Sequence, residues 1–204
     1  VLDTYYREHG DFSLGPMNYS ELRDQLPLML ADAAAGSERI KAIVDDLKGF
    51  SRQSEERLDD PVDVNQVVQS SVNLVSSHLK KATRKLEVVL TPDLPQVHGN
   101  GRRLEQVVIN LLLNSCDALD SPDGEIRVST GIAGDGRVAI EVADTGRGIA
   151  EEDVPRITDP FFTTRRTAGG TGLGLSISAG IIEEHGGELV FESKQGAGTT
   201  ARIL

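Results

Sequence analysis

The chain has no tryptophan, a single cysteine and few aromatic residues, which make up 4% of its 204 positions. Cys116 has no partner for a disulfide within the chain, and the sequence shows no cluster of zinc ligands. No apolar run reaches the roughly 18–20 residues that a membrane span requires. The first ten residues also lack the basic and apolar regions of a signal peptide. These absences favour a reducing compartment.

Positive charge is also scarce, because 21 Lys and Arg residues face 32 Asp and Glu residues and leave a net charge of -11. This acidic balance argues against broad nucleic-acid binding, which needs a basic footprint. The 38% of hydrophobic residues suffice for a core, which excludes general disorder. The length fits one domain with an appendage, or two small domains. The chain begins with Val1 rather than methionine, which we interpret as the sign of a fragment.

A heptad pattern follows a glycine- and proline-containing loop expected over residues 9–18. Apolar or small residues recur at alternating spacings of four and three. This pattern fits an amphipathic helix packed on its own domain, or a helix of an oligomeric bundle, and its narrow seam favours the bundle. The seam positions are Leu26, Leu30, Ala33, Ser37, Ile40, Val44, Leu47 and Ser51.

After residue 60 the chain mixes helical and strand patterns. Gly134-Asp135-Gly136 separates two strands in the manner of a hairpin. Hairpins mixed with helices predict an α+β protein, with a mixed sheet and helices on one face. We expect helices at about 65–81, 101–119, 151–157 and 173–185, and strands at 62–64, 86–90, 125–132, 137–142, 188–193 and 199–204.

The helix expected over 101–119 carries an unusual polar stripe. Gln106, Asn110, Asn114 and Asp117 fall within roughly 80° of arc. A solvated face would normally carry Lys, Glu or Arg, and this stripe has none of them. Its amide and carboxylate oxygens suit a hard cation such as Mg²⁺ that also touches phosphates. A solvated face remains the alternative.

Two further blocks each have a functional and a structural interpretation. In Asp144-Thr145-Gly146-Arg147-Gly148-Ile149, Asp144 could accept a hydrogen bond from an exocyclic amine and Ile149 could pack on a flat ring, but the block could also be a strand-ending turn. The glycine run over 169–174 opens a helix, and exposed backbone N–H groups at a helix start favour phosphate. It lacks the spacing of a P-loop, and a flexible glycine loop is the alternative.

The combination of blocks is more specific than any one of them. QVVINLLLNSCDAL, DTGRGI, DPFFTT and GGTGLGLSIS occur in this order and resemble the catalytic ATP-binding domain of sensor histidine kinases. The resemblance covers about residues 61–204, including IIEEHGGEL and QGAGTTARI. It implies the Bergerat (GHKL) fold, a two-layer α/β sandwich with a mixed sheet and helices on one face. It also implies that residues 1–60 are part of a dimerisation and phosphotransfer region, with a long helix of a dimeric helical bundle.

The resemblance also implies site residues. Asn114 matches a Mg²⁺ ligand, Asn110 lies beside the phosphates, and Asp144 bonds the adenine amine. Asn110, Asn114 and Arg165 are the expected catalytic residues. At Asp117 many family members carry a basic residue, so its role is open. The expected nucleotide-binding residues are Asn110, Asn114, Asp117, Asp144, Gly146, Gly148, Ile149, Phe161, Thr163, Thr164, Gly170, Thr171, Gly172, Leu173, Gly174, Leu175 and Thr199, and Phe162 and Arg165 join the lid.

The implied function is that of a protein-histidine kinase. It would use ATP and Mg²⁺, pass phosphate to the receiver domain of a response regulator, and form a homodimer through its helical region. The location would be cytoplasmic, with membrane attachment of the parent protein left open. This fragment would contact neither membrane nor nucleic acid.

The four histidines mark a departure from the family. None of His9, His78, His98 and His185 lies in the expected H-E-x-x-x-P motif. We therefore expect the phosphoacceptor upstream of Val1 and a fragment that is inactive alone. A nucleotide-binding regulatory module without kinase activity is the alternative. An ATP-hydrolysing clamp would need a catalytic glutamate, and Glu105 is off the phosphate stripe.

Overall fold

The computed structural model describes residues 2–15, 17–30, 36, 58–164 and 171–204. The described residues fall into one part before residue 37 and another after residue 57. In the first part, helix α1 (Leu2–His9) precedes the strands β1 (Ser13–Leu14) and β2 (Met17–Asn18), which pair antiparallel. The loop expected over 9–18 therefore contains a hairpin, whose two-residue strands are too short to leave a periodic signal.

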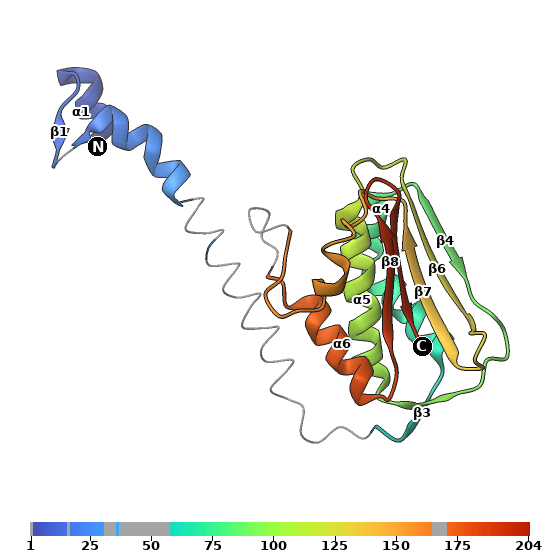
Figure 1. Cartoon of the computed structure of the whole chain (residues 1–204). Coiled ribbons are helices and arrows are strands. Elements are labelled where there is room, and N and C mark those ends of the chain that lie inside the picture. The colour runs from blue at the N-terminus through green and yellow to red at the C-terminus, as the bar shows by residue number, and fades with distance from the viewer. Residues whose placement is uncertain (1, 16, 31–35, 37–57, 165–170) are drawn as a thin grey trace.

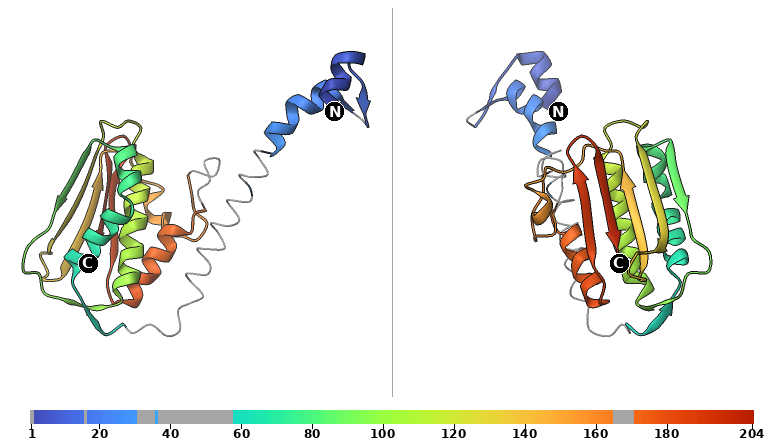
Figure 2. Two further views of the ribbon diagram at one scale, coloured as in Figure 1. Left: turned by 180° about the vertical axis from the view of Figure 1, so that it is seen from behind. Right: turned by 45° about the vertical axis from the view of Figure 1, so that its right-hand side comes forward.

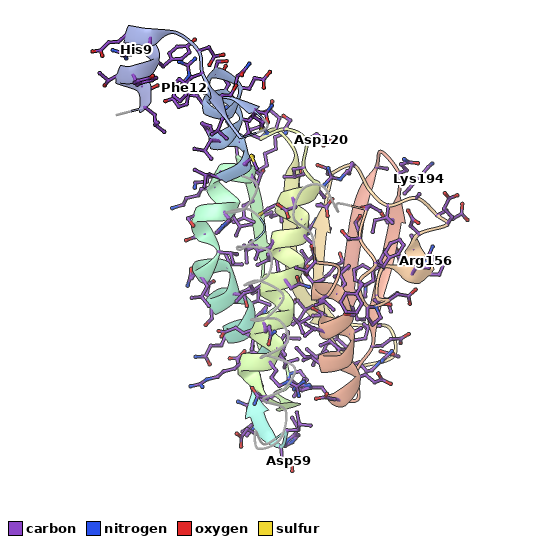
Figure 3. All side chains as sticks on the ribbon, turned by 90° about the vertical axis from the view of Figure 1, so that its left-hand side faces the viewer. His9, Phe12, Asp59, Asp120, Arg156 and Lys194 are labelled. Carbon is purple, nitrogen blue, oxygen red and sulfur yellow. The ribbon has the colours of Figure 1, made fainter. Side chains whose placement is uncertain are left out.

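Aromatic rings hold this N-terminal part together. Tyr5 stacks on His9 with ring centroids 4.3 Å apart, and Phe12 stacks on Tyr19 at 5.0 Å. His9 and Phe12 lie in this part in Figure 3. Residues 19–30 are helical, and the Asp11 carboxylate accepts hydrogen bonds from the Ser20 amide (3.0 Å) and hydroxyl (2.6 Å). A side chain that accepts from the first helical amides fixes the helix start.

Only the beginning of the heptad seam lies in the described residues. Leu26 is 46% exposed and Leu30 is 61% exposed, so neither is covered by the part of the chain that the structure describes. The remaining seam positions, Ala33, Ser37, Ile40, Val44, Leu47 and Ser51, lie outside the described residues. The helical bundle thus stays a prediction.

A five-stranded mixed sheet forms the centre of residues 58–204, in the order β4-β6-β7-β9-β8. β4 runs parallel to β6, and the other neighbours are antiparallel. This confirms the predicted mixed sheet. Asp144, which lies beyond the strand expected over 137–142, is the last residue of β7 and pairs with Thr199 of β9. The strands are β4 (Lys85–Val89), β6 (Glu125–Ile132), β7 (Val138–Asp144), β8 (Leu189–Lys194) and β9 (Gly198–Ile203).

Helices cover one face of this sheet, as the views from two sides show (Figures 1 and 2). They are α3 (Val64–Leu74), α4 (Ser76–Ala82), α5 (Gly101–Ala118) and α6 (Gly174–Glu184). Alternate residues of β6 point into the core, where Ile126 and Val128 are fully buried. Valines and leucines of α3 and α5 meet them from the other layer. The period of two in the strand and of 3.6 in the helices thus makes one shared core.

The helix expected over 65–81 is divided at Val75, where the backbone leaves the helical region (φ -98°, ψ 13°). Val75 and Leu79, on either side of this division, both lie in the core, where they are 5% and 1% exposed. A periodicity argument misses such a bend because both halves keep a helical pattern. Asp63 begins α3 by accepting from the amides of Asn65 (2.8 Å) and Gln66 (3.3 Å).

Two short strands close the other end of this part. β3 (Asp60–Val62) pairs antiparallel with β5 (Val97–Gly99). The strand expected over 62–64 begins earlier, and β5 was not predicted because three residues show no alternation. The helix expected over 151–157 is the 3₁₀ turn η1 (Val154–Arg156), which contains Pro155. No helix in the described ranges is long and apolar enough to cross a bilayer.

Candidate functional site

A cavity of about 420 Å³ opens between α5, the end of β7 and the start of α6. Figure 3 marks the two ends of the part formed by residues 58–204. Asp120, after α5, and Lys194, at the end of β8, lie toward one end, and Asp59 lies at the other. The residues that line the cavity are Asn110, Leu111, Leu113, Asn114, Ser115, Asp117, Ala118, Val142, Asp144, Arg147, Gly148, Ile149, Ile157, Phe162, Thr163, Thr164, Thr171, Gly172, Gly174, Leu175, Phe191, Thr199 and Ala201.

The polar stripe of α5 supplies one wall of this cavity. Asn110, Asn114 and Asp117 line it, whereas Gln106, one turn earlier, is exposed and lies outside it. The Asn110 amide donates to the Ser178 hydroxyl of α6 (2.9 Å). The Asn114 amide donates to Asn110 Oδ1 (3.5 Å), which leaves its own Oδ1 on the other side of the amide group. Asn114 and Asp117 are also exposed, so the stripe is a solvated face that forms part of a concave site.

Asp144 lies half-buried in the cavity wall at the end of β7. Its carboxylate accepts hydrogen bonds from the Gly146 amide (2.9 Å) and the Ser115 hydroxyl (3.2 Å). Burial raises the pKa of this carboxyl above its ordinary value, and these hydrogen bonds oppose the rise. Asp144 thus offers an acceptor in a site from which water is partly excluded.

The loop after Asp144 is held against the turn between β8 and β9. Gly148 has φ +64°, and a Cβ there would lie 2.1 Å from the Lys194 carbonyl oxygen, so only glycine fits. The Ile149 amide donates to the Ser193 hydroxyl (2.9 Å), and the Gly196 amide donates to the Arg147 carbonyl (2.7 Å). These contacts fix Ile149 in the cavity lining.

Arg147 joins the same loop to the end of α5. Its guanidinium donates to the Asp117 carbonyl (2.5 Å), and its amide donates to the Ala118 carbonyl (3.0 Å). The last carbonyls of a helix have no partner within the helix and favour cationic donors. The arginine thereby ties the loop that carries Ile149 to the helix that carries Asn114.

The start of α6 approaches Asn110 closely. A Cβ on Gly174 would lie 2.5 Å from Asn110 Oδ1, so a side chain there would displace the asparagine. Gly172 has φ +69°, and its carbonyl accepts from the Phe161 amide (2.9 Å). The backbone amides that open α6 therefore lie beside the amide side chains of α5, an arrangement that suits an anion.

Three expected site residues do not line the cavity. Phe161, with φ +66°, is 63% exposed, and Leu173 is buried. Gly146 is buried, and its backbone N–H donates a hydrogen bond to the Asp144 carboxylate. Arg165 and Gly170 lie outside the described residues.

Comparison with known proteins identifies the family. Residues 99–204, just over half of the chain, match the family of histidine kinase-, DNA gyrase B- and HSP90-like ATPases. The chain belongs to this ATPase family. Members of the family bind ATP, and the cavity has the concave shape and mixed apolar and polar lining that such a ligand needs.

The chain is similar to several bacterial sensor proteins. It is 32% identical over 200 residues to a sensor protein of Shewanella frigidimarina, a match that covers 98% of this chain and 30% of that protein. It is 36% identical over 174 residues to the sensor histidine kinase ZraS of Klebsiella oxytoca, covering 85% and 36% of the two chains. The chain thus spans about a third of the length of these relatives.

A solved structure agrees with the fold. The mycobacterial sensor histidine kinase MprB superposes with a TM-score of 0.62 at 28% identity, over 71% of this chain and 95% of that one. The two-layer arrangement with a mixed sheet is therefore the fold of this ATPase family, as the sequence predicted.

The cavity fits a divalent cation only if a ligand supplies further oxygens. The described residues contain no group of three or more His, Cys, Asp or Glu side chains that could hold a metal. Asn114, whose amide oxygen is the kind of hard donor that Mg²⁺ takes, lines the cavity together with Asn110, Asp117 and Asp144. Mg²⁺ keeps several waters and often shares substrate phosphates rather than sitting in an all-protein cage, and this donor set fits that behaviour.

The residues predicted for the site did not include the serines whose hydroxyl groups hold the site residues in place. Ser115 and Ser178 are buried and bond Asp144 and Asn110, yet serines inside apolar helical runs look like ordinary core positions. Ser193 bonds Ile149 across a separation of 44 residues. No local signal in the sequence could have shown these pairs, because each joins elements that meet only in the fold.

Proposed function

We propose that this chain is the ATP-binding catalytic region of a sensor histidine kinase. Residues 61–204 bind ATP with Mg²⁺, and residues 1–60 belong to a dimerisation and phosphotransfer region. The γ-phosphate goes to a histidine outside this chain and then to an aspartate of a response-regulator receiver domain. One observation carries the proposal: the half-buried carboxylate of Asp144 and the amides of Asn110 and Asn114 line one cavity with the glycines that open α6.

The adenine base binds at the end of the cavity formed by the last residues of β7 and the loop that follows. The Asp144 carboxylate accepts a hydrogen bond from the exocyclic amine of adenine, and the loop that holds Ile149 against Ser193 supports packing on the ring. Thr199 lines the same end because it pairs with Asp144 across β7 and β9. A charge-assisted hydrogen bond in a partly desolvated site discriminates strongly between an amine and a carbonyl at that position.

The phosphate end lies between α5 and α6. Backbone amides around Gly172 and Gly174 bind the phosphates, and Asn110 orients them from the facing helix. A bound Mg²⁺, held by Asn114, would neutralise phosphate charge. Phosphoryl transfer depends mainly on positioning and charge stabilisation, which these groups supply.

The phosphoacceptor histidine and the second copy come from outside the site. The chain's four histidines all lie in the described residues, and none of them lines the cavity. His98 and His185 bond the backbone at Asp59 and Ile181, and His9 stacks on Tyr5. Exposed Leu26 and Leu30, the two seam residues in the described part, support pairing with a second copy of the helical region.

Two alternatives have less support. A hydrolytic clamp would use a glutamate on α5, but Glu105 does not line the cavity. A regulatory module without kinase chemistry would bind nucleotide equally well, so only a transfer experiment separates it from the kinase.

The binding proposal is tested by calorimetry with ATP and Mg²⁺. Asp144→Asn and Asn114→Ala should each lower the affinity at least about thirtyfold, which corresponds to about 2 kcal/mol for a charged hydrogen bond or metal contact. Gln106→Ala, on the same stripe but outside the cavity, should bind like the wild type. Wild-type affinity in both site variants would exclude this cavity as the ATP site.

The transfer proposal is tested with the full-length gene product and γ-labelled ATP. A phosphohistidine is labile to acid and stable to base, so the label should show this behaviour and be absent from the Asn114→Ala variant. A full-length protein that binds ATP but takes up no label would favour the regulatory module.

A further inference from the structure

His185 ends α6, and its ring joins this helix to the start of α5. Nε2 accepts a hydrogen bond from the Asn100 amide (2.9 Å), and Nδ1 bonds the Ile181 carbonyl (2.7 Å). An amide N–H can only donate and a carbonyl oxygen can only accept. The two bonds therefore fix the ring as the neutral tautomer with its proton on Nδ1.

The ring also packs directly on the backbone of β5. A Cβ on Gly99 would lie 2.5 Å from the Cδ2 atom of His185, so a side chain at residue 99 would push the ring away. β5 pairs with β3, and His98 Nδ1 bonds the Asp59 carbonyl (3.1 Å). His185 thus contacts the ribbon through which the chain enters this part of the molecule.

The same two helices meet again at the cavity. Asn110 donates to Ser178, and Gly174 allows the close approach of α6 to Asn110. At the His185 end, Arg103 in the first turn of α5 also forms an ion pair with Glu184, the last residue of α6. His185 follows Gly174 by eleven residues, so the ring lies about 16 Å along the helix from the phosphate end.

We propose that His185 is a positioning residue for the nucleotide site. Its acceptor nitrogen holds Asn100, and thereby sets α6 against α5 at the end remote from the cavity. A helix is stiff over three turns, so releasing this end changes how Gly174 meets Asn110. The inference rests on the proposed ATP site, but His185 itself does not line that site.

A purely structural role would be a simpler use of a histidine at a helix end, since a polar or cationic side chain commonly interacts with the last carbonyls there. The two roles differ in what a glutamine can restore. Glutamine at 185 can reach Asn100 with its Oε1 atom, whereas leucine keeps a similar apolar bulk but offers no acceptor.

The test compares His185→Leu with His185→Gln by calorimetry with ATP and Mg²⁺, at a temperature where both variants are folded by circular dichroism. We expect the leucine variant to bind at least about fivefold more weakly and the glutamine variant to remain within about twofold of the wild type. If the leucine variant does not fold, Gly99→Ala, which displaces the ring, takes its place with the same expected loss.

Leu79→Ala provides the control for general destabilisation, since Leu79 is buried in α4 and lies outside the cavity lining. It should lose stability and keep the wild-type affinity. The proposal is overturned if the leucine variant binds like the wild type, or if the glutamine variant binds as weakly as the leucine variant. A wild-type protein that binds no ATP would instead refute the proposed function, and this inference with it.

Discussion

The carboxylate of Asp144 shows how single residues of the site are held before a nucleotide binds. Ser115, from the last turn of α5, and Gly146, two residues after Asp144, both donate to it. These bonds favour the ionised form, and burial opposes it more strongly, so the pKa is raised. A charge that is kept partly desolvated lowers the stability of the folded chain and strengthens any hydrogen bond that a ligand donates to it.

This balance predicts how stability depends on pH. Because the folded pKa of Asp144 is raised above the unfolded value near 3.8, the folded state binds the proton more tightly. The carboxyl therefore loses its favourable contribution as pH rises through the raised value. Asp144→Asn should match the wild type near pH 3.5 and become progressively more stable than it toward pH 7, in urea unfolding followed at several pH values. A difference that does not change with pH would contradict the raised pKa.

Burial also raises the pKa of a second group, the thiol of Cys116. Its thiol packs against the core, and burial with help from the charge of Asp117 raises its pKa to about 11. The reactive thiolate is then about a hundredfold scarcer than at the ordinary value of 9.0. Iodoacetamide at pH 8 should alkylate the native protein at least about a hundredfold more slowly than the urea-unfolded chain, as measured by mass spectrometry. Equal rates would mean that the thiol is exposed.

At the scale of elements, the site depends on how two loops fit together. The loop after β7 and the turn between β8 and β9 approach so closely that a Cβ on Gly198 would lie 2.0 Å from the Asp144 carbonyl oxygen. Gly148 and Gly198 each leave room for a neighbouring carbonyl oxygen, so their role here is close packing rather than flexibility. The sequence shows the glycines, and only the paired strands show what each one makes room for.

A matched pair of glycine substitutions tests this fit. Gly148→Ala places a Cβ against the Lys194 carbonyl at a positive φ, and we expect a loss of about 2–4 kcal/mol in the free energy of unfolding. Gly134→Ala, in the β6–β7 turn, meets no atom within 4 Å and should change stability by less than about 0.5 kcal/mol. Urea titrations give both values. Similar losses in the two variants would show that the close approach at Gly148 is not what matters.

At the scale of the whole molecule, the cavity joins both layers of the sandwich. α5 and α6 of the helical layer and β7, β8 and β9 of the sheet all contribute lining residues. A ligand that binds across these elements stabilises all of them together, because it binds the folded state alone.

This coupling predicts a metal-dependent rise in thermal stability. At a ligand concentration a hundred times the dissociation constant, ATP with Mg²⁺ should add about 2.7 kcal/mol to the stability. We expect the melting temperature to rise clearly with ATP and Mg²⁺ and to fall back when EDTA is added. In Asn114→Ala the rise should be small and should not change with EDTA, as measured by scanning calorimetry. An EDTA effect that persists in this variant would point to a different metal ligand.

The fold class and the elements that carry the site were accessible from local patterns, whereas the expected site residues came from the resemblance of the four combined blocks to a known family. The apolar period of α5 and its stripe of amides predicted both the helix and the wall of the cavity, and the strand before Asp144 predicted where its carboxylate would be. These features are local, since a helix or strand repeats the same geometry wherever it occurs. The division of the chain at residue 60 stays a prediction, as does the metal role of Asn114.

The contacts between segments far apart in the sequence could be seen only in the tertiary structure. The β3–β5 ribbon and the hydrogen bonds that Ser178 and His185 make with the α5 segment join parts whose separation in sequence carries no periodic signal. The bend at Val75 is hidden for another reason, since the helical period continues on both sides of it. The amino-acid order by itself determines which elements form and which faces are apolar, because those depend on neighbours along the chain. Only packing decides which serine meets which carboxylate and which glycine leaves room for a carbonyl, because those contacts exist only once the two layers have closed on their shared core.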